Sequence, residues 1–445
     1  MTHPARLDTS LQTDILIVGA GPAGCAAAIT LAQAGRQVLL IDQHDFPRDK
    51  TCGDGLIPDS MQALERLGVL TTVRQAATAV KGLACHGPKG GTLYIPSDLA
   101  VLPRKTLDQC LFERAKAVGA TVMTGVRYLE PIKDSQGRVT GARIKGSRVV
   151  GASLMGANIN DAPTDIDGCQ TEVQAKWTIL ATGATVGTLQ ATGQCTRALP
   201  SAMALRAYVH HPEFVDDEGK PIEHLHISWH KSYAPGYGWI FPCPNGIYNI
   251  GVGLFSMHEI SWRAKLAKLP GFKRLPSLKP QKLNLAELFK QFTDSNPMAK
   301  RLMQTGTLMG EIKGAPLRCS LEGAKPAAPG LLVTGEAMGS TYALTGEGIG
   351  KAMETGMLSA QALLEHTNDT DICRAYEHLL KELKPKFSVY QQANKINRAP
   401  WLIDLAIARG NKSPRLVKRM SLVLEEKANP AKLFTLRGAW KFLTD

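Results

Sequence analysis

The N-terminal part of the chain alternates between strand-like and helix-like hydrophobic patterns. Residues 14–18 form a short apolar run that ends in glycines, residues 22–34 are rich in alanine at helical spacing, and residues 37–41 are again apolar. The pattern therefore predicts a strand, a helix and a second strand in direct succession.

Further elements of both kinds follow along the chain. We expect helices and buried strands in this order: a helix at 60–67, a helix at 104–118, a strand at 119–124, a strand at 177–181, a strand at 330–334 and a helix at 348–364. A polar stretch at 151–174 looks like an insertion on a hairpin. The buried strands indicate a fold assembled from segments that are distant in sequence.

Between about 190 and 310 the pattern changes. Three segments alternate between apolar and polar positions, at 203–209, 225–229 and 247–254, which is typical of an antiparallel sheet. The segment at 371–445 is mostly helical in pattern, with breaks expected at Pro385, Pro400, Pro414 and Pro430. A second, sheet-containing domain and a helical C-terminal segment are therefore expected.

Composition and charge narrow the class of protein. The chain has 445 residues, 44% of them hydrophobic, with no run of eighteen apolar residues and no apolar leader in residues 1–13, so we expect a cytoplasmic protein without a transmembrane helix. Nine cysteines occur without a CxxC pair, which suits reduced thiols and argues against a metal site.

Most of the net charge of +13 lies in residues 381–445, which hold 14 Lys and Arg against 5 Asp and Glu. No stacking aromatics interleave this basic run, so nucleic acid is not an expected partner.

A glycine fingerprint lies between the first strand and helix. The GxGxxG segment comprises Gly19, Gly21, Pro22, Ala23 and Gly24. Backbone amides at such a turn can approach a pyrophosphate, where side chains would block it. Asp42, followed by Gln43, ends the second strand, and a carboxylate at this distance from the last glycine can accept hydrogen bonds from a ribose. A merely tight turn is the alternative, but the full context favours a dinucleotide site.

Two later segments favour FAD over NAD. Arg104 and Asp108 match the pattern by which flavoproteins of the glutathione reductase type hold the adenosine part of FAD, although a surface i,i+4 salt bridge is an equal alternative. Residues 335–350 read GEAMGSTYALTGEGIG between a strand and a long helix. The helix that begins near Gly348 can aim its N-terminal amides at a flavin pyrimidine ring, which is negatively charged when reduced. A glycine-rich linker is the alternative.

Aromatic side chains and a thiol complete the candidate chemistry. Tyr237, Trp239 and Phe241 alternate along a strand and so share one face, where they either line an apolar pocket or fill a sheet core. Cys52 precedes Gly53 in a glycine-rich loop, where a thiol either faces a ligand or is inert.

At these residues the chain resembles the geranylgeranyl reductase family, within the group 1 type of FAD-dependent monooxygenases and halogenases. The resemblance covers residues 14 to about 365 and rests on the fingerprint, on KTCGDGL at 50–56, on the aromatic motif and on LTGEGI at 344–349. The family pattern YxWxFPx8GxG is matched by Tyr237, Trp239, Phe241, Pro242, Gly251 and Gly253. The resemblance implies that this motif lines a substrate cavity facing the flavin, with Cys52, Tyr237 and Trp239 as catalytic candidates.

The same resemblance assigns further residues to the cofactor. The expected FAD-binding positions outside the fingerprint are Asp42, Gln43, Cys52, Gly53, Arg104, Gly183, Gly335, Glu336, Thr345, Gly346, Gly348 and Ile349. Two of the neighbouring positions depart from the family. Glu336 stands where many relatives have Asp, and Thr182 replaces the acid that precedes Gly183 in hydroxylases of this fold. The electron donor, NAD(P)H or ferredoxin, is therefore undetermined.

The pattern and the resemblance together predict an α/β fold, α+β overall. A discontinuous Rossmann-like FAD-binding domain is expected at 1–80, 105–190 and 305–370, an inserted antiparallel substrate domain at 81–104 and 191–304, and a basic helical segment at 371–445.

Three functions fit this prediction. The first is reduction of C=C bonds in an apolar, isoprenoid-like substrate by hydride from the reduced flavin N5. The second is a monooxygenase acting on a biosynthetic or carrier-bound intermediate. Halogenases of this fold carry WxWxIP where Tyr237 and Phe241 stand here, which argues against halogenation. The third is a non-catalytic FAD-bound assembly or redox-sensing factor.

The basic C-terminal segment suggests a partner. In RAPWLIDLAIA at 398–408, Trp401, Leu402, Leu405 and Ala408 recur at helical spacing, followed by Lys412, Arg415, Lys418 and Arg419. Such a helix fits an anionic membrane surface, where lipid substrates reside, an acidic carrier protein or a ferredoxin, or it simply packs against the body.

Overall fold

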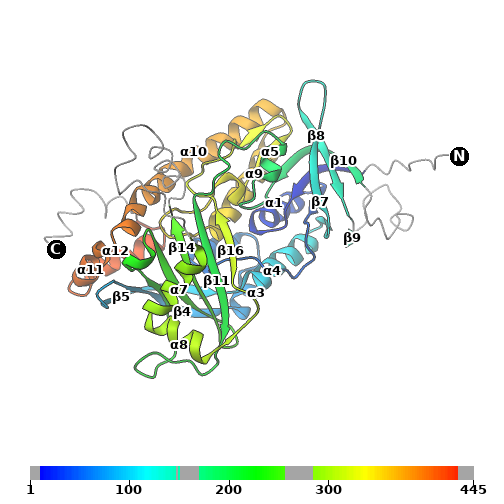
Figure 1. Cartoon of the computed structure of the whole chain (residues 1–445). Helices are drawn as coiled ribbons and strands as arrows, with labels where there is room; N and C mark the ends of the chain where they lie inside the picture. The colour runs from blue at the N-terminus through cyan, green and yellow to red at the C-terminus, as the bar shows by residue number, and fades with distance from the viewer. Residues whose placement is uncertain (1–10, 147–148, 151–169, 256–283, 429–445) are drawn as a thin grey trace, which may run out of the picture.

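A computed structural model of the chain describes residues 11–146, 149–150, 170–255 and 284–428 (Figure 1). Two nine-stranded sheets and their helices make up these parts, and the predicted α/β class is confirmed. Most of the expected insertion at 151–174, and Pro430, lie outside the described residues.

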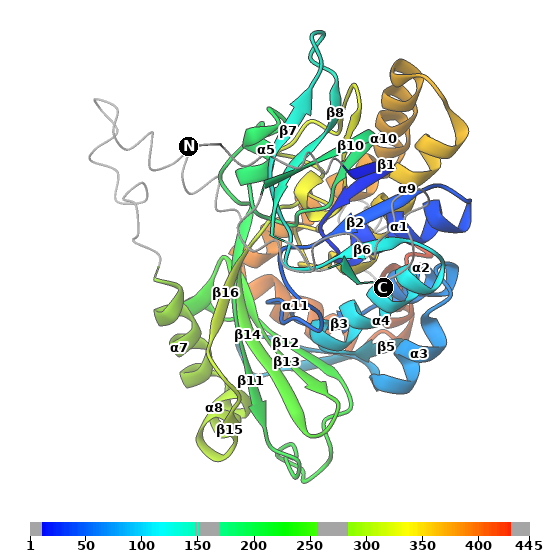
Figure 2. The same ribbon diagram turned by 90° about the vertical axis from the view of Figure 1, so that its right-hand side faces the viewer.

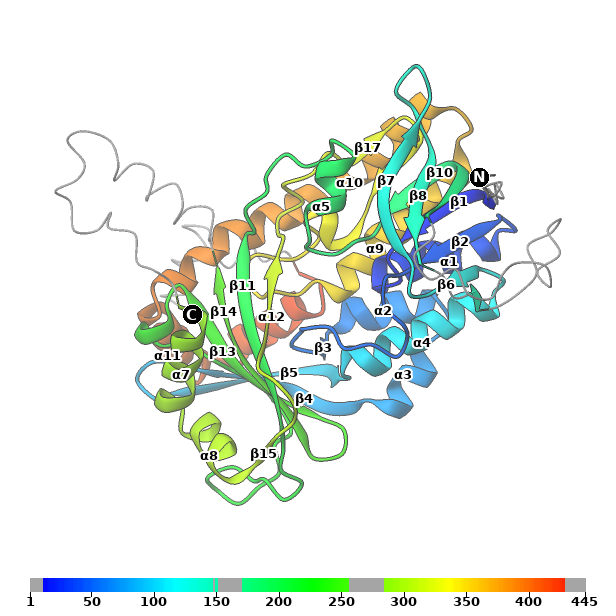
Figure 3. The same cartoon turned by 45° about the vertical axis from the view of Figure 1, so that its right-hand side comes forward.

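Parallel strands from distant parts of the chain form the centre of the first sheet, and antiparallel strands pair at its edges. Its order is β17, β18, β10, β1, β2, β6 and β9, with the bounds Ala327–Ala328, Leu331–Val333, Gln170–Leu180, Leu11–Val18, Val38–Ile41, Thr121–Met123 and Val149–Val150. β1 is central and pairs in parallel with β2 and with β10. β7 (Arg127–Lys133) and β8 (Val139–Lys145) form an antiparallel hairpin that projects from the sheet, in cyan in Figure 3. All four residues of β2 are buried, so its sequence is continuously apolar and does not alternate.

Two helices from opposite ends of the chain lie against each other beside this sheet. α1 (Pro22–Gln33) packs on α9 (Ile349–Glu365), and α9 also contacts α2 (Pro58–Arg66) and α10 (Asp369–Ala393). α4 (Arg104–Ala117) covers another side of α1. The α1–α9 contact is close because Gly356 has no side chain; a Cβ there would lie 2.2 Å from the Ala23 carbonyl oxygen. Helices that lie far apart in the sequence thus form one core.

The second sheet is mainly antiparallel and lies beside the first unit (Figure 2). Its order is β15, β11, β14, β13, β12, β4, β5 and β3, and β16 pairs with β11. The bounds in that order, with β16 last, are Thr307–Leu308, Ala202–His210, Ile247–Phe255, Gly236–Cys243, Leu225–Ser228, Thr78–His86, Thr92–Val101, Gly55–Leu56 and Lys313–Leu317. α7 (Leu285–Ser295) and α8 (Pro297–Thr305) cover its outer face, where Phe292 is fully buried.

Three short strands belong to a different sheet than the expected domain boundaries implied. β3, β15 and β16 belong to the second sheet, although boundaries at 81 and 304 placed them in the FAD-binding unit. β3 and β15 have two residues each, too few to display a periodicity, and the five residues of β16, KGAPL, do not alternate between apolar and polar positions.

The C-terminal segment continues as helices. α11 (Trp401–Gly410) and α12 (Pro414–Leu424) pack on β4 and β5. The prediction that Pro385 breaks a helix was wrong, because α10 runs through it. Phe387 and Tyr390, just after the proline, are buried against the body and hold the helix together across the lost backbone hydrogen bond. Within the described parts of the chain, no helix is long and apolar enough to cross a bilayer.

The α1–α9 contact yields a stability prediction. Replacing Gly356 by Ala should destabilise the fold by about 1–3 kcal/mol, because the added methyl overlaps backbone that cannot move without separating the helices. The better helix propensity of alanine, worth about 1 kcal/mol, does not offset this overlap. Urea unfolding measures the difference. Gly187→Ala, at a helix start with open space around it, is the matched control, and equal midpoints for both variants would contradict the expectation.

Candidate active site

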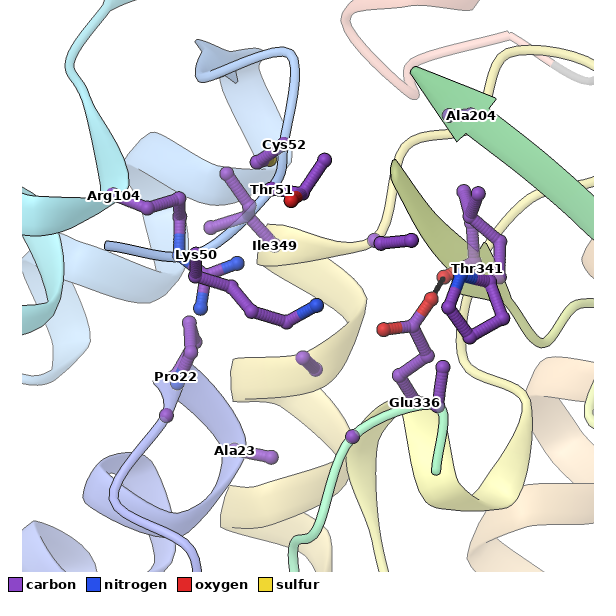
Figure 4. Close-up of a pocket in the computed structure, with 18 of the residues that line it drawn as sticks. Pro22, Ala23, Lys50, Thr51, Cys52, Arg104, Ala204, Glu336, Thr341 and Ile349 are labelled. Atoms are coloured by element: carbon purple, nitrogen blue, oxygen red, sulfur yellow. Dashed lines mark hydrogen bonds between the residues drawn. The ribbon is translucent and has the colours of Figure 1, made fainter. Parts of the chain in front are cut away.

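A cavity of about 720 Å³ lies between the two sheets and is within the size range of cofactor and ligand sites. Its walls come from the start of α1, the loop at 48–55, the segment at 341–349 and the inner face of the second sheet. In Figure 4, Arg104, Lys50 and Cys52 lie on one side of the start of α9, with Glu336 and Thr341 across from them. Nearly every predicted site residue lines this space; Gly24, Gly251 and Gly335 do not, and they act through the backbone beside it.

The fingerprint glycines have distinct structural causes. Gly19 has a φ of +103°, and a Cβ on it would lie 2.4 Å from the Ala181 carbonyl oxygen. A Cβ on Gly24 would lie 1.8 Å from the carbonyl oxygen of Gly19 itself. Gly21 is different, because the atoms nearest an added Cβ belong to guanidinium groups: Arg48 at 3.6 Å and Arg104 at 3.9 Å. Two cations over the N-terminus of α1 fit an anionic pyrophosphate.

Arg48 was missed by the sequence analysis. Its guanidinium lies 3.1 Å from Asp108 and 3.6 Å from Asp42. Arg104 makes a bidentate salt bridge with Asp108, in which Nε donates to Oδ1 at 2.6 Å and Nη2 donates to Oδ2 at 2.8 Å. Asp108 is fully buried, so this pair is not the surface salt bridge that we held as an alternative. The FPR sequence at 46–48 carries no recognisable motif, and only the fold brings Arg48 to the fingerprint.

Asp42 supports the fingerprint turn directly. One of its carboxylate oxygens accepts a hydrogen bond from the Ala20 amide at 2.9 Å, and the other accepts one from the His44 amide at 3.0 Å. Asp42 and Gln43 also line the cavity. Asp42 therefore has a structural role in the turn that the sequence did not reveal, and its contact with a ribose stays a prediction.

The glycine-rich segment at 335–350 brings α9 to the cavity. Gly335 has a φ of +65° and Gly346 a φ of +70°, which glycine adopts without strain. Gly348 caps α9 without any side-chain hydrogen bond, so the first amides of the helix are free to serve a ligand. Glu336, Thr345, Gly346, Gly348 and Ile349 all line the cavity, as does Gly183 beyond β10. These residues fit the pyrimidine side of a flavin.

Aromatic rings form the opposite wall. Tyr237, Trp239 and Phe241 are on the inner face of β13, and Tyr237 stacks on Phe255 with ring centroids 5.2 Å apart. The Tyr237 hydroxyl donates to the Thr345 carbonyl oxygen, which joins the wall to the segment before α9. The aromatics thus both fill a sheet core and line a pocket, so the two alternatives hold together.

The two glycines of the aromatic motif make room for this wall. A Cβ on Gly251 would lie 2.1 Å from Trp239 Cζ2 and 2.4 Å from the Leu205 carbonyl oxygen. A Cβ on Gly253 would lie 3.1 Å from the edge of the Phe255 ring and, in ordinary contact, 3.8 Å from Trp239 Cζ3. Gly251 is therefore the position that fixes the indole against the sheet.

A buried polar network, also missed by the sequence analysis, ties the wall to the Cys52 loop. Trp239 Nε1 donates to Asn249 Oδ1 at 2.9 Å. Asn249 Nδ2 in turn donates to the Cys52 carbonyl oxygen at 2.8 Å and to Asp54 Oδ2 at 2.7 Å. Asp54 also accepts hydrogen bonds from the Tyr208 hydroxyl and, at 3.2 Å, from the Arg104 amide. Burial raises the pKa of Asp54 to about 6.

The Cys52 thiol lines the cavity and stays protonated. Burial, and then the charge of Asp54, raise the pKa of the thiol above its usual value. Its sulfur accepts a weak hydrogen bond from the Asp54 amide at 3.4 Å. A protonated thiol is a poor nucleophile but is able to give up a proton.

Two acids line the cofactor side. Burial raises the pKa of Glu336, and Thr341 donates to this carboxylate at 3.5 Å. Burial, followed by the charges of Asp59 and Glu426, raises the pKa of Glu347 to about 8. Glu347 was not predicted, although it lies inside the LTGEGI motif. Glu347 can therefore hold a proton next to a ligand near neutral pH.

Comparisons with known proteins agree with this geometry. A family model of an FAD binding domain matches residues 12–153. A digeranylgeranylglycerophospholipid reductase from Methanothrix thermoacetophila is 24% identical, over 81% of this chain and 80% of that protein. Menaquinone reductase from Mycolicibacterium smegmatis is 30% identical over 384 residues, which cover 83% of this chain and 81% of that protein. This chain belongs to the geranylgeranyl reductase family. It is an FAD-dependent oxidoreductase.

Solved structures share its fold. A geranylgeranyl bacteriochlorophyll reductase-like protein from Thermoplasma acidophilum has a TM-score of 0.71 at 21% identity and covers 96% of this chain and 99% of that one. A flavin-dependent brominase has a TM-score of 0.67 at 18% identity, over 97% of this chain and 99% of that one. The fold is therefore common to reductases and halogenases, and the chemistry must be argued from the site.

The Gly251 contact yields a second prediction. Gly251→Ala should lower stability by about 1–3 kcal/mol and shift the tryptophan near-UV circular dichroism, because the methyl displaces the Trp239 ring. Gly253→Ala should change both less, because its added methyl would only touch the Trp239 ring at 3.8 Å and press on the edge of Phe255 at 3.1 Å. Indistinguishable spectra for the two variants would contradict this assignment.

Glu347 yields a pH prediction for the protein without cofactor. A carboxyl whose pKa is raised on folding stabilises the fold below its unfolded pKa, and this contribution is lost as the pH rises through about 8. Glu347→Gln removes the titration. The melting temperature of the variant minus that of the wild type should therefore increase between about pH 5 and about pH 9. Glu113→Gln, at an exposed site on α4, should show no such trend, and a constant difference for Glu347→Gln would refute the assignment.

Proposed function

We propose that this flavoprotein reduces carbon–carbon double bonds in an apolar, isoprenoid-like substrate. The observation that carries the proposal is the wall of Tyr237, Trp239, Phe241 and Phe255, which faces the cofactor side of the same cavity. An alkene has little charge to bind, so recognition depends on apolar contact. The names of two relatives, menaquinone reductase and digeranylgeranylglycerophospholipid reductase, support a lipid substrate.

The chain's own residues have three tasks in this reaction. When bound and reduced, FAD supplies a hydride from N5 to one alkene carbon. The aromatic wall holds the double bond in place, and its rings keep bulk water out of the cavity. The Cys52 thiol gives its proton to the second carbon, and the resulting thiolate recovers a proton from solvent. The substrate thus gains two hydrogens, and its two electrons come from the reduced cofactor.

Anaerobic single turnover tests the reaction. Enzyme reduced with dithionite is mixed with a geranylgeranyl phospholipid, so that the result does not depend on whether NAD(P)H or ferredoxin is the donor. We expect the flavin to reoxidise without oxygen, with two mass units added per bond. Incorporation of 18O from labelled O₂, with no anaerobic reoxidation, would instead establish a monooxygenase. No substrate change under either condition would favour a non-catalytic factor.

Cys52 has a sharper test within this assay. In FAD-saturated protein, Cys52→Ala should slow substrate-dependent flavin reoxidation by about 10²–10⁴-fold, the usual contribution of a positioned general acid. Cys110→Ala, a partly buried cysteine on α4 outside the cavity lining, is the control. Wild-type reoxidation in Cys52→Ala would exclude the thiol as the proton donor.

A further inference from the structure

α11 has two apolar faces, and only one of them packs on the protein. Ile403 and Ile407 are buried against Leu93 and Ile95 of β5. Trp401 and Leu405 lie on the opposite face and are 63% and 37% exposed. Ala408 continues this face one turn later and is also exposed. The exposed face, Trp401, Leu405 and Ala408, has no function in the fold that the structure describes.

Positive charge flanks this face along the chain. Residues 398–419 contain six Lys and Arg and a single acid, Asp404. That acid is engaged by the body, since it accepts a hydrogen bond from the Lys89 amide at 3.0 Å. Lys412, Arg415 and Lys418 are exposed and make no ion pair with any residue in the described part of the chain. The combination of an exposed Trp and Leu with free cations is complementary to anionic headgroups over an apolar layer.

The same helix is connected to the cavity. Asn397, just before α11, accepts a hydrogen bond from Trp229 Nε1 at 2.7 Å and donates one to the Leu344 carbonyl oxygen at 3.2 Å. The Trp229 ring packs beside Tyr237, with centroids 5.8 Å apart. Leu83 both lines the cavity and joins the apolar cluster under α11. Apolar side chains therefore continue from the cavity to the helices at the surface. The exposed face of α11 lies at this end of the molecule.

We propose that the exposed face of α11, together with Lys412, Arg415 and Lys418, docks on an anionic lipid bilayer. Trp401 and Leu405 insert at the headgroup level, and the cations contact anionic headgroups. A lipid-borne substrate then meets the enzyme at the end nearest the aromatic wall; this last step rests on the proposed function, whereas the docking does not. An acidic protein partner would complement the cations but would offer no apolar layer for Trp401 and Leu405.

Vesicle flotation of the full-length FAD-bound protein tests the docking. Vesicles of phosphatidylcholine mixed with phosphatidylglycerol, with and without brominated chains, are compared with phosphatidylcholine alone. We expect binding to the anionic vesicles that weakens with salt, and quenching of tryptophan fluorescence by the brominated chains. Lys412→Glu/Arg415→Glu/Lys418→Glu should weaken binding by about 100-fold or more, since each cation near an anionic surface contributes roughly a factor of five.

Apolar variants separate insertion from simple attraction. Trp401→Ser/Leu405→Ser should abolish the quenching and lower the affinity at least tenfold, with an unchanged melting temperature and flavin spectrum. Leu308→Ser/Met309→Ser changes two exposed apolar residues at the end of β15 and should bind as the wild type does. Absence of flotation with anionic vesicles at low salt, or an equal loss in the control, would overturn the proposal. So would loss of a dimer in Trp401→Ser/Leu405→Ser by sedimentation, which would assign the face to a second copy.

The docking proposal and the proposed function can be refuted independently. A protein that floats with vesicles but reduces no detergent-solubilised prenyl lipid supports the docking and refutes the proposed function. A protein that reduces the solubilised lipid but binds no vesicle refutes the docking alone.

Discussion

The carboxylate of Asp54 joins the two halves of the molecule. It is completely buried, and it accepts hydrogen bonds from Tyr208 and Asn249 of the second sheet and from the Arg104 amide at the start of α4. A buried carboxyl without such partners would be strongly unfavourable, so the sheets and the helix must meet here in one arrangement. Asp54 also adopts a positive φ of 66°, which a non-glycine residue keeps only when its surroundings require it. The Cys52 loop and the indole of Trp239 take their positions from this same network.

Glycine occurs at several positions where neighbouring atoms leave no room for a side chain. At Gly24 and Gly356 the neighbour is main chain, and at Gly251 it is both an indole ring and main chain. The constraint at these positions is steric. At Gly21, by contrast, an added Cβ would have room, since it would only touch the guanidinium groups of Arg48 and Arg104 at 3.6 and 3.9 Å, so the constraint there concerns the ligand. The same residue type therefore marks packing in one place and cofactor binding in another.

Much of the fold could be predicted from the sequence because its elements are long and strongly patterned. The α1 and α9 helices, β1, β2, β6 and β18 of the first sheet, and β11, β12 and β14 of the second lie within a few residues of their predicted ranges. β10 begins seven residues before the predicted strand, and β4, β5, β7 and β8 had no predicted counterpart. What was missed depends on tertiary proximity. Arg48, Tyr208 and Asn249 have no local signal, since each becomes part of the site only when segments distant in sequence come together. Asp54 lies inside the KTCGDGL motif, but its partners are distant in sequence. Pro385 was misjudged for a related reason, because tertiary packing of α10 outweighs the local cost of a proline.

The position of β18 has a consequence for how the protein is made. β18 pairs with residues 178–180 of β10, yet the chain from 181 to 330, including most of the second sheet, lies between them. While the ribosome is still producing that insertion, the end of β10 is an open strand edge and α1 lacks its partner helix α9. Open edges of this kind pair with other chains, so the nascent protein is most prone to aggregation in this interval. Expression conditions that shorten or shield this stage should therefore affect the yield of folded flavoprotein more than those that stabilise the finished fold.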